Sequence, residues 1–289
     1  MNQELGSQGV HSNQEWLPPI GSVTGQDVLS DVVRLSSSAI GDRLIAVYAL
    51  GSLAHGGFSP VVSDVDAGLI LNDPIRQSDA KLLLDLADSV RSIGSLLHSR
   101  VSIFWGTPES LTGRGAGGRF PPLDRLCLFE HGRLLMGNDR RRGLRPPSQS
   151  DLVATGAQFA LDTLAEDILA RARDPDTLVA AGVRWTTKIV LFPARFVYTA
   201  DTGREGTNEA AVQHYSAQNG APSAELVRAA LEWRTSPPSR DHAATMLRNG
   251  LVPLYDFYLT DHIHRLQAVR ESELADAFSD WRSRLLATS

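Results

Sequence analysis

Two kinds of hydrophobic periodicity occur in the first half of the chain. Residues 44–50 and 65–71 are short, almost continuous apolar runs rich in strand-forming residues, and residues 100–105 have the same character. Residues 25–40 and 79–97 instead place apolar residues three and four positions apart, the pattern of an amphipathic helix. This order of strands and helices predicts a mixed sheet that carries helices, an α+β fold.

The pattern changes at residues 140–151, where Pro146 and Pro147 lie in a polar run that predicts a linker. Pro193 and Pro253 are expected to begin or kink helices, because proline has no amide hydrogen for the helix ladder. Beyond the linker we find only helical spacing, over residues 151–172, 182–199, 223–233 and 241–269. The chain is therefore predicted to contain a polar tail (1–18), a sheet-bearing domain (19–147) and an all-α helical bundle (148–289).

Composition narrows the class of protein. The net charge of −5 argues against a general binder of nucleic acid or anionic membranes, because phosphate backbones require dense local basicity. The single cysteine, Cys127, excludes an internal disulfide and favours a reducing compartment. We find neither a run of about 18 apolar residues nor a secretory signal pattern, so we expect a cytoplasmic protein without a membrane span.

The most informative segment is GSLAHGGFSPVVSDVD, residues 51–66. Side chains alternate between the faces of a strand, so Asp64 and Asp66 are expected on one side, about 6–7 Å apart at their Cα atoms. Two carboxylates on one face can share Mg²⁺, which often adds substrate phosphates as ligands. Gly51 permits close backbone approach to a ligand, and Ser52 begins a predicted short helix whose amides favour phosphate oxygens. Together these residues predict a cradle for a metal-bound triphosphate.

Each part of this segment also has a purely structural interpretation. Gly-Ser pairs are common in turns, and Ser-Asp-x-Asp at the start of a strand can cap a turn or form a solvated edge. The functional interpretation is favoured because the parts occur together, between two apolar strands.

The same segment resembles the signature of the DNA polymerase β-like nucleotidyltransferase superfamily. Two later segments, FEHGRLLMGND (129–139) and KIVLFPARFVYTADTGREGTNEAA (188–211), resemble the bacterial aminoglycoside nucleotidyltransferases, in particular the streptomycin/spectinomycin adenylyltransferases. The resemblance implies that residues 19–147 form a nucleotidyltransferase domain. It also implies roles for individual residues: phosphate contacts for Ser52 and Ser63, Mg²⁺ ligation for Asp64 and Asp66, and nucleotide contacts for Arg195 and Trp233.

The chain departs from the superfamily at the third carboxylate, which usually lies on the strand after the intervening helix. The alignment places Arg100 there, and an arginine neither accepts a proton at neutral pH nor binds Mg²⁺. Strand alternation predicts that His98, Arg100 and Ser102 share one face, which holds no acid. His98 and Glu109 are alternative bases, although each also has an ordinary structural interpretation. Arg100 is also a candidate to pair with a phosphate or with the two aspartates.

A second departure lies after the Thr-Gly turn of the later segment. Relatives usually have a lysine near the phosphates, where this chain has Asn208, with Arg204 close enough in sequence to substitute. Loss of that point charge is expected to weaken triphosphate binding.

These observations lead to one expected function and two alternatives. We expect Mg²⁺-dependent transfer of a nucleoside monophosphate, AMP from ATP, to a hydroxyl of a small molecule bound between the domains. The resemblance implies an aminoglycoside-like antibiotic as acceptor, and a metabolic acceptor fits equally well. Because Arg100 replaces the acid, a noncatalytic nucleotide- or metabolite-binding protein on the same scaffold is the first alternative. An ATP-dependent ligation through an adenylated intermediate is the second.

Overall fold

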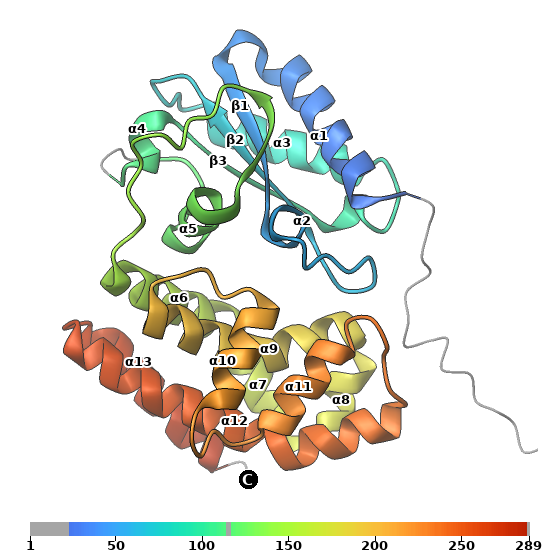
Figure 1. The fold of residues 1–289 in the computed structure, drawn as a ribbon, viewed down its shortest axis with the longest axis vertical. Helices are drawn as coiled ribbons and strands as arrows, with labels where there is room; N and C mark the ends of the chain where they lie inside the picture. Colours follow the sequence, from blue (N-terminus) through green and yellow to red (C-terminus); the bar gives the residue numbers. More distant parts are fainter. Residues whose placement is uncertain (1–22, 114–116, 288–289) are drawn as a thin grey trace, which may run out of the picture.

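The computed structural model describes residues 23–113 and 117–287, so the predicted tail over residues 1–18 lies outside the described part. A four-stranded mixed sheet is followed by a set of helices (Figure 1), which confirms the predicted fold class. None of the helices in the described residues combines the length and apolar character needed to cross a membrane.

The sheet has the strand order β3-β2-β1-β4. Strand β2 pairs in parallel with β3, whereas β1 pairs antiparallel with both β2 and β4. The strands are β1 (Leu44–Leu50), β2 (Val65–Leu71), β3 (Val101–Gly106) and β4 (Arg133–Gly137). The two central strands are almost fully buried, which explains their continuous apolar sequences.

Helices cover both faces of this sheet. On one face, α1 (Gly25–Ile40) and α3 (Asp79–Arg91) bury their apolar stripes against alternate residues of the strands. Thr24 begins α1 with a capping box, in which its hydroxyl accepts from the Asp27 amide and the Asp27 carboxylate accepts from the Thr24 amide. On the other face, α5 (Pro122–His131) packs Cys127 and Leu128 against β1.

The sequence pattern placed two boundaries wrongly in this half. Helix α3 ends at Arg91 rather than Leu97, and the chain then turns through Gly94, which has φ = 102°. Leu97 nevertheless returns to the core, 5% exposed, which is why its spacing imitated a longer helix. Residues His98–Arg100 form a 3₁₀ turn, η3, so β3 begins at Val101.

Some N-terminal elements were not predicted. These are helix α5 and the edge strand β4, together with the 3₁₀ turn η2 (Gly41–Arg43). The short α4 (Pro108–Leu111) agrees with the structural interpretation of Glu109 as part of a helix start. The expected short helix after Gly51 is present as α2 (Gly51–His55). Strand β4 was not predicted because it is short and mostly exposed, so its sequence shows little alternation of apolar and polar residues.

The rest of the chain is helical: α6 (Gln149–Thr163), α7 (Ala165–Arg173), α8 (Pro175–Ala180), α9 (Val183–Thr202), α10 (Asn208–Ala217), α11 (Ala224–Glu232), α12 (Arg240–Ala268) and α13 (Ser272–Leu286). The stretch predicted as one helix over 151–172 is divided between α6 and α7 at Leu164. Leu164 is fully buried, so the apolar pattern continues across the break.

We expected Pro193 and Pro253 to begin or kink helices, and neither of them begins one. Both lie inside continuous helices, α9 and α12. Pro193 has no amide hydrogen to donate to the carbonyl of Ile189, four residues earlier. The buried hydroxyl of Tyr255 donates to that carbonyl instead, at 2.8 Å, and thereby satisfies it.

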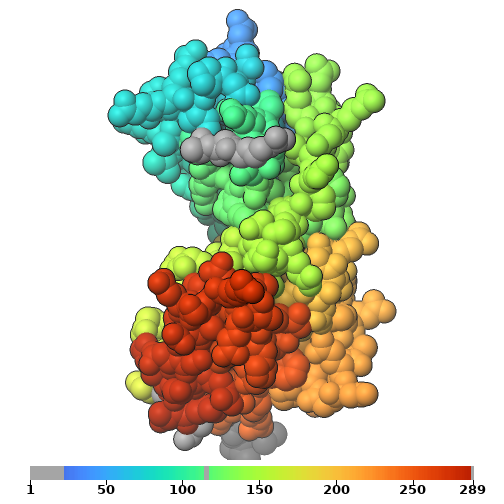
Figure 2. All heavy atoms as spheres, turned by 90° about the vertical axis from the view of Figure 1, so that its left-hand side faces the viewer, coloured from blue at the N-terminus to red at the C-terminus, as the bar shows by residue number. Residues whose placement is uncertain are grey.

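The two parts of the chain meet along the loop between α2 and β2. Val61 and Val62 of this loop pack into the hydrophobic core of the helical part. In Figure 2 the N-terminal part (blue to green) and the helical part (yellow to red) form two lobes joined through the segment drawn in light green. The residues that lie between the lobes are therefore contributed by both parts.

Candidate functional site

A cavity of about 470 Å³ lies between the sheet and the helical part. It brings together predicted site residues that are distant in sequence: Gly51, Ser52, Ser63, Asp64, Asp66, Arg195 and Asn208. A second cavity of about 200 Å³ shares the residues Gly51, Asp66 and Arg195 and extends toward α5. The segment of residues 51–66 thus forms one wall of the larger cavity.

The turn after β1 faces the carboxylate of Asp66. Gly51 has φ = 55°, and a Cβ added to it would lie only 2.5 Å from Oδ2 of Asp66. The strand register places Asp66 opposite Leu50 on β1 and opposite Ser102 on β3. Glycine is therefore required at position 51 for two reasons, its left-handed conformation and the space taken by the carboxylate.

Asp66 is an unpaired acid. Its carboxylate forms no hydrogen bond or ion pair with any residue in the described ranges. Burial, reinforced by the charge of Asp64, raises the pKa of Asp66 to about 6. A half-buried carboxylate without an ion-pair partner is stabilised by a cation that binds beside it.

Asp64 already has two cationic partners, both on α9. Arg184 donates to Oδ1 at 2.5 Å, and Lys188 donates to Oδ2. Burial alone would raise the pKa of Asp64, but Lys188 and Arg184 together hold it below its ordinary value. Burial and the neighbouring Arg184 lower the pKa of Lys188, although Asp64 opposes them. These contacts connect the sheet to the helical part directly.

The two aspartates fit a magnesium ion that is shared with a nucleotide. No group of three or more His, Cys, Asp or Glu side chains able to hold a metal occurs in the described residues. Two carboxylates with substrate phosphates are, however, a common Mg²⁺ environment. The unpaired carboxylate of Asp66, enclosed against the glycine turn, fits such an ion. At Asp64 the ion would compete with Arg184 and Lys188.

Arg100 forms no ion pair with Asp64 or Asp66 among the described residues, and it lies in the 3₁₀ turn η3 rather than on a strand. Its Nη1 donates to the backbone carbonyls of Pro60 and Val61, at 3.3 and 3.0 Å. The prediction that His98, Arg100 and Ser102 share a strand face is wrong, because the first two belong to η3. Of these three residues, only Ser102 lines the cavity.

The alternative bases lie elsewhere. His98 is 3% exposed, and its ring nitrogens contact Ser95 and Asp31 at 2.6 and 3.2 Å on the α1 side of the sheet. Glu109 is exposed in α4 and lines neither cavity. The positions of His98 and Glu109 therefore agree with their ordinary structural interpretations rather than with a role as the base.

The loop of Ser63 is held by the helical part. Ser63 is 6% exposed, and its hydroxyl accepts from the Ser59 amide at 3.0 Å. Arg234, which follows α11, donates to the Gly57 carbonyl at 2.6 Å and contacts Ser63 Oγ at 3.4 Å. Ser59 in turn donates to the Arg234 carbonyl at 2.6 Å. Ser52 lines the cavity from α2.

The predicted residues of the helical part are divided between the cavity and other locations. Arg195 lines both cavities, and its Nε donates to the Gly206 carbonyl at 2.5 Å. Asn208 lines the larger cavity at the start of α10. Arg204 is exposed and pairs with Glu130 at 3.1 Å. Trp233 is 3% exposed in the helical core and lines neither cavity.

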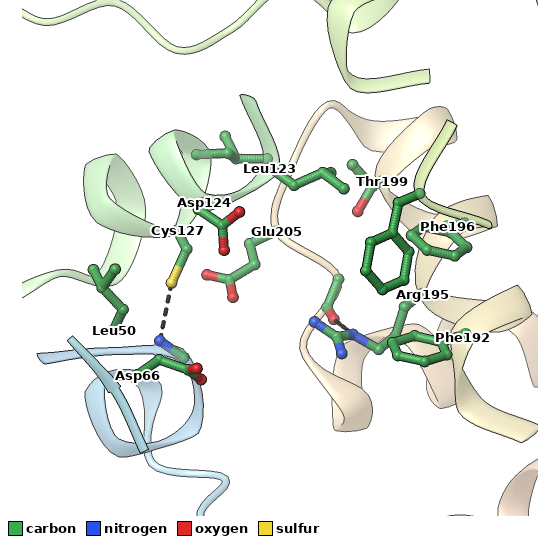
Figure 3. A pocket seen from close by; sticks show the side chains of 14 residues that line it. Leu50, Asp66, Leu123, Asp124, Cys127, Phe192, Arg195, Phe196, Thr199 and Glu205 are labelled. Carbon is green, nitrogen blue, oxygen red and sulfur yellow. Dashed lines mark hydrogen bonds between the residues drawn. The ribbon is translucent and has the colours of Figure 1, made fainter. Parts of the chain in front are cut away.

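Sequence reasoning missed five residues of this site: Asp124, Arg184, Lys188, Glu205 and Arg234. Arg184 and Lys188 are 120 and 124 positions from Asp64, and no sequence pattern connects them. Asp124 lies in the first turn of α5, where an aspartate is normally explained by the helix dipole. Figure 3 shows Asp66, Asp124 and Glu205 around one cavity, with the hydrogen bond from the Gly51 amide to the Cys127 sulfur, 3.1 Å long.

Comparisons with known proteins agree with this geometry at the level of the fold. No family model matches the chain, and no curated protein matches it in sequence. Among solved structures, the crystal structure of spectinomycin adenyltransferase AAD(9) from Enterococcus faecialis, with ATP and spectinomycin, matches with a TM-score of 0.52 at 14% identity. The match covers 79% of this chain and 98% of the other.

The chain has a nucleotidyltransferase fold. This confirms the resemblance inferred from the sequence motifs as a likeness of fold alone. In this fold, the cavity between the sheet and the helical part is the place where the predicted phosphate and metal residues meet Arg195, whereas Trp233 lies in the helical core.

Proposed function

We propose that this protein transfers a nucleoside monophosphate, AMP from ATP, to a hydroxyl group of a small molecule, with Mg²⁺ as cofactor. The observation that carries the proposal is the unpaired Asp66 carboxylate directly against the Gly51–Ser52 turn, with Asp64 beside it. This arrangement supplies oxygen ligands for a cation next to the amides and hydroxyl of a short helix start.

Within the site, the residues have separate tasks. Asp64 and Asp66 would hold Mg²⁺, which supplies charge neutralisation at the triphosphate when bound. Ser52 and Ser63 line the wall where the phosphates are proposed to lie, and Arg195 faces them from α9. The acceptor is proposed to bind between the two parts of the chain, because both cavities are lined by both parts. Such chemistry depends chiefly on positioning and charge.

The likeness to an adenyltransferase solved with ATP and spectinomycin supports ATP as the co-substrate and a small molecule as the acceptor. An aminoglycoside-like antibiotic is the first acceptor to test. A cytoplasmic location is proposed on the basis of the single, buried, free cysteine, Cys127.

A second candidate function, nucleotide or metabolite binding without transfer, is favoured by two observations. Both oxygens of Asp64 are engaged by Arg184 and Lys188, and the usual third acid position holds Arg100. In that case the two cations would serve as fixed counter-charges for bound phosphates.

The deciding experiment measures pyrophosphate release from ATP and Mg²⁺ over a panel of hydroxylated acceptors that includes spectinomycin and streptomycin. We expect acceptor-dependent release, and a loss of at least about 100-fold in kcat for Asp66→Asn, because removing one preorganised charged group costs that order of rate. Asp85→Asn is the control, since Asp85 forms only an exposed pair with Lys81 on α3. Nucleotide binding without release for any acceptor would instead support the second candidate.

A further inference from the structure

The missing third carboxylate leaves open which group accepts the proton of the acceptor hydroxyl. Asp124, which no sequence motif indicates, lines both cavities together with Asp66. It comes from the first turn of α5, and in Figure 3 its carboxylate lies near Glu205 at the cavity that Asp66 also lines.

The carboxylate of Asp124 is free to act. It forms no hydrogen bond or ion pair with any residue in the described part of the chain. The charged groups that face it come from several elements: Asp66 from β2, Arg119 after β3, Arg195 from α9 and Glu205 before α10. Of the two cations, Arg119 donates to the Ile103 carbonyl and Arg195 to the Gly206 carbonyl, and neither forms an ion pair with Asp124 among the described residues.

Each of the other acids of the cavity has a charged neighbour or a different proposed role. Asp64 is paired with Arg184 and Lys188, and Asp66 faces the glycine turn as a proposed metal ligand. Glu205 lies 3.7 Å from the His131 imidazole, against the Cys127 thiol, and its Oε2 has no hydrogen-bond partner among the described residues. Asp124 is therefore the acid of the cavity that has neither a cationic neighbour within ion-pair distance among the described residues nor a proposed metal-binding role.

We propose that Asp124 is the general base of the transfer reaction, accepting the proton of the acceptor hydroxyl in place of the absent third carboxylate. This inference rests on the proposed function. In the step, the acceptor oxygen forms a bond to the α-phosphorus while the bond between that phosphorus and the bridging oxygen breaks. Pyrophosphate leaves with the electron pair, and the hydroxyl proton moves to the Asp124 carboxylate.

The electrostatics of the position suit this role. Burial, with the charge of Asp66 as the next cause, raises the pKa of Asp124 to about 7. A base with a pKa near the working pH combines a populated ionised form with useful basicity. An aspartate that only stabilised the first turn of α5 would not need to line the cavity.

The test compares wild type, Asp124→Asn, Asp124→Glu and the control Asp241→Asn by pyrophosphate release. Asp241 is also a first-turn acid, of α12, but it is exposed and lines neither cavity. For Asp124→Asn we expect kcat to fall about 100-fold or more while KM for ATP and acceptor changes less than about threefold, as for loss of a general base. Asp124→Glu should recover part of kcat, and Asp241→Asn should resemble wild type.

The pH dependence gives a readout that a structural role would not produce. A base must be ionised, so wild-type kcat should rise with pH to a plateau with a midpoint near 7, and Asp124→Asn should lose this rise. Near-normal kcat in Asp124→Asn, a defect confined to KM, or an unchanged pH profile would overturn the inference and leave the proposed function standing. Absence of pyrophosphate release by the wild type with every acceptor would overturn both.

Discussion

At the scale of single residues, Gly51 and Asp66 depend on each other. The backbone at Gly51 has φ = 55°, and the place of a Cβ is taken by the Asp66 carboxylate. Gly41 offers a comparison within the same chain, because it has φ = 62° and nothing within 4 Å of an added Cβ. Both positions have a φ value that L side chains rarely adopt, and only at Gly51 does a side chain occupy the place of the Cβ.

We therefore expect both Gly51→Ala and Gly41→Ala to lower the free energy of unfolding, each by about 1–2 kcal/mol or more, because alanine is strained at a positive φ. Only Gly51→Ala should also reduce pyrophosphate release, by at least about tenfold, since its methyl group displaces Asp66. Urea unfolding and steady-state kinetics on both variants check this. Equal activity in the two variants would show that the close approach at Gly51 has no role in transfer.

At the scale of elements, the sequence pattern identified the buried strands well and the site only in part. Strands β1 and β2 were predicted with the observed bounds because they are buried on both faces and therefore continuously apolar. The short exposed β4 was not, and the break at Leu164 was hidden by a continuing apolar pattern. Local patterns record burial, and they do not record which distant elements meet.

The same limit applies to the candidate site. The segment of residues 51–66 carries its own spacing signal, so its glycine, serines and aspartates were found. Arg184 and Lys188 reach Asp64 only through the packing of α9 against the sheet, and Asp124 reaches the cavity only through the placement of α5. Tertiary structure creates these associations, so a single sequence gives no spacing from which to infer them.

Helix α9 carries Arg184, Lys188 and Arg195, and its continuity past Pro193 therefore matters to the site. The Tyr255 hydroxyl donates to the Ile189 carbonyl that Pro193 leaves without a helical partner. We expect Tyr255→Phe to lower the free energy of unfolding by about 1–2 kcal/mol, because it orphans a buried carbonyl. In a Pro193→Ala background the alanine amide can satisfy that carbonyl, so the cost should fall to less than half.

Urea unfolding of the double-mutant cycle measures this coupling. Tyr215→Phe is the control, since its hydroxyl donates to the Pro222 carbonyl at 2.9 Å, independently of Pro193. Its cost should be the same in both backgrounds. Equal costs of Tyr255→Phe with and without Pro193 would contradict the proposed compensation.

At the scale of the whole molecule, the site exists only where the two parts of the chain meet. Polar contacts join them at Asp64 with Arg184 and Lys188, at Arg204 with Glu130, and at Arg234 with the loop after α2. The loop fixed by Arg234 carries Ser63, which is a proposed phosphate contact. The helical part therefore supports the nucleotide wall in addition to contributing its own side of the cavity.

Arg234→Met should reveal this support, because methionine retains an apolar stem and removes the contacts to Gly57 and Ser63. Loss of a buried, charge-assisted hydrogen bond costs about 1.5–3 kcal/mol. If half of that loss appears as nucleotide binding, KM for ATP rises about 3- to 12-fold, since 1.4 kcal/mol corresponds to one factor of ten. We expect a smaller change in kcat, because Asp64 and Asp66 remain in place once ATP is bound.

Arg248→Met is the matched control in the helical part, where Arg248 forms only an exposed pair with Asp176. Initial rates over a range of ATP concentrations measure the difference, and an unchanged KM in Arg234→Met would show that the Ser63 loop keeps its shape without help from the helical part.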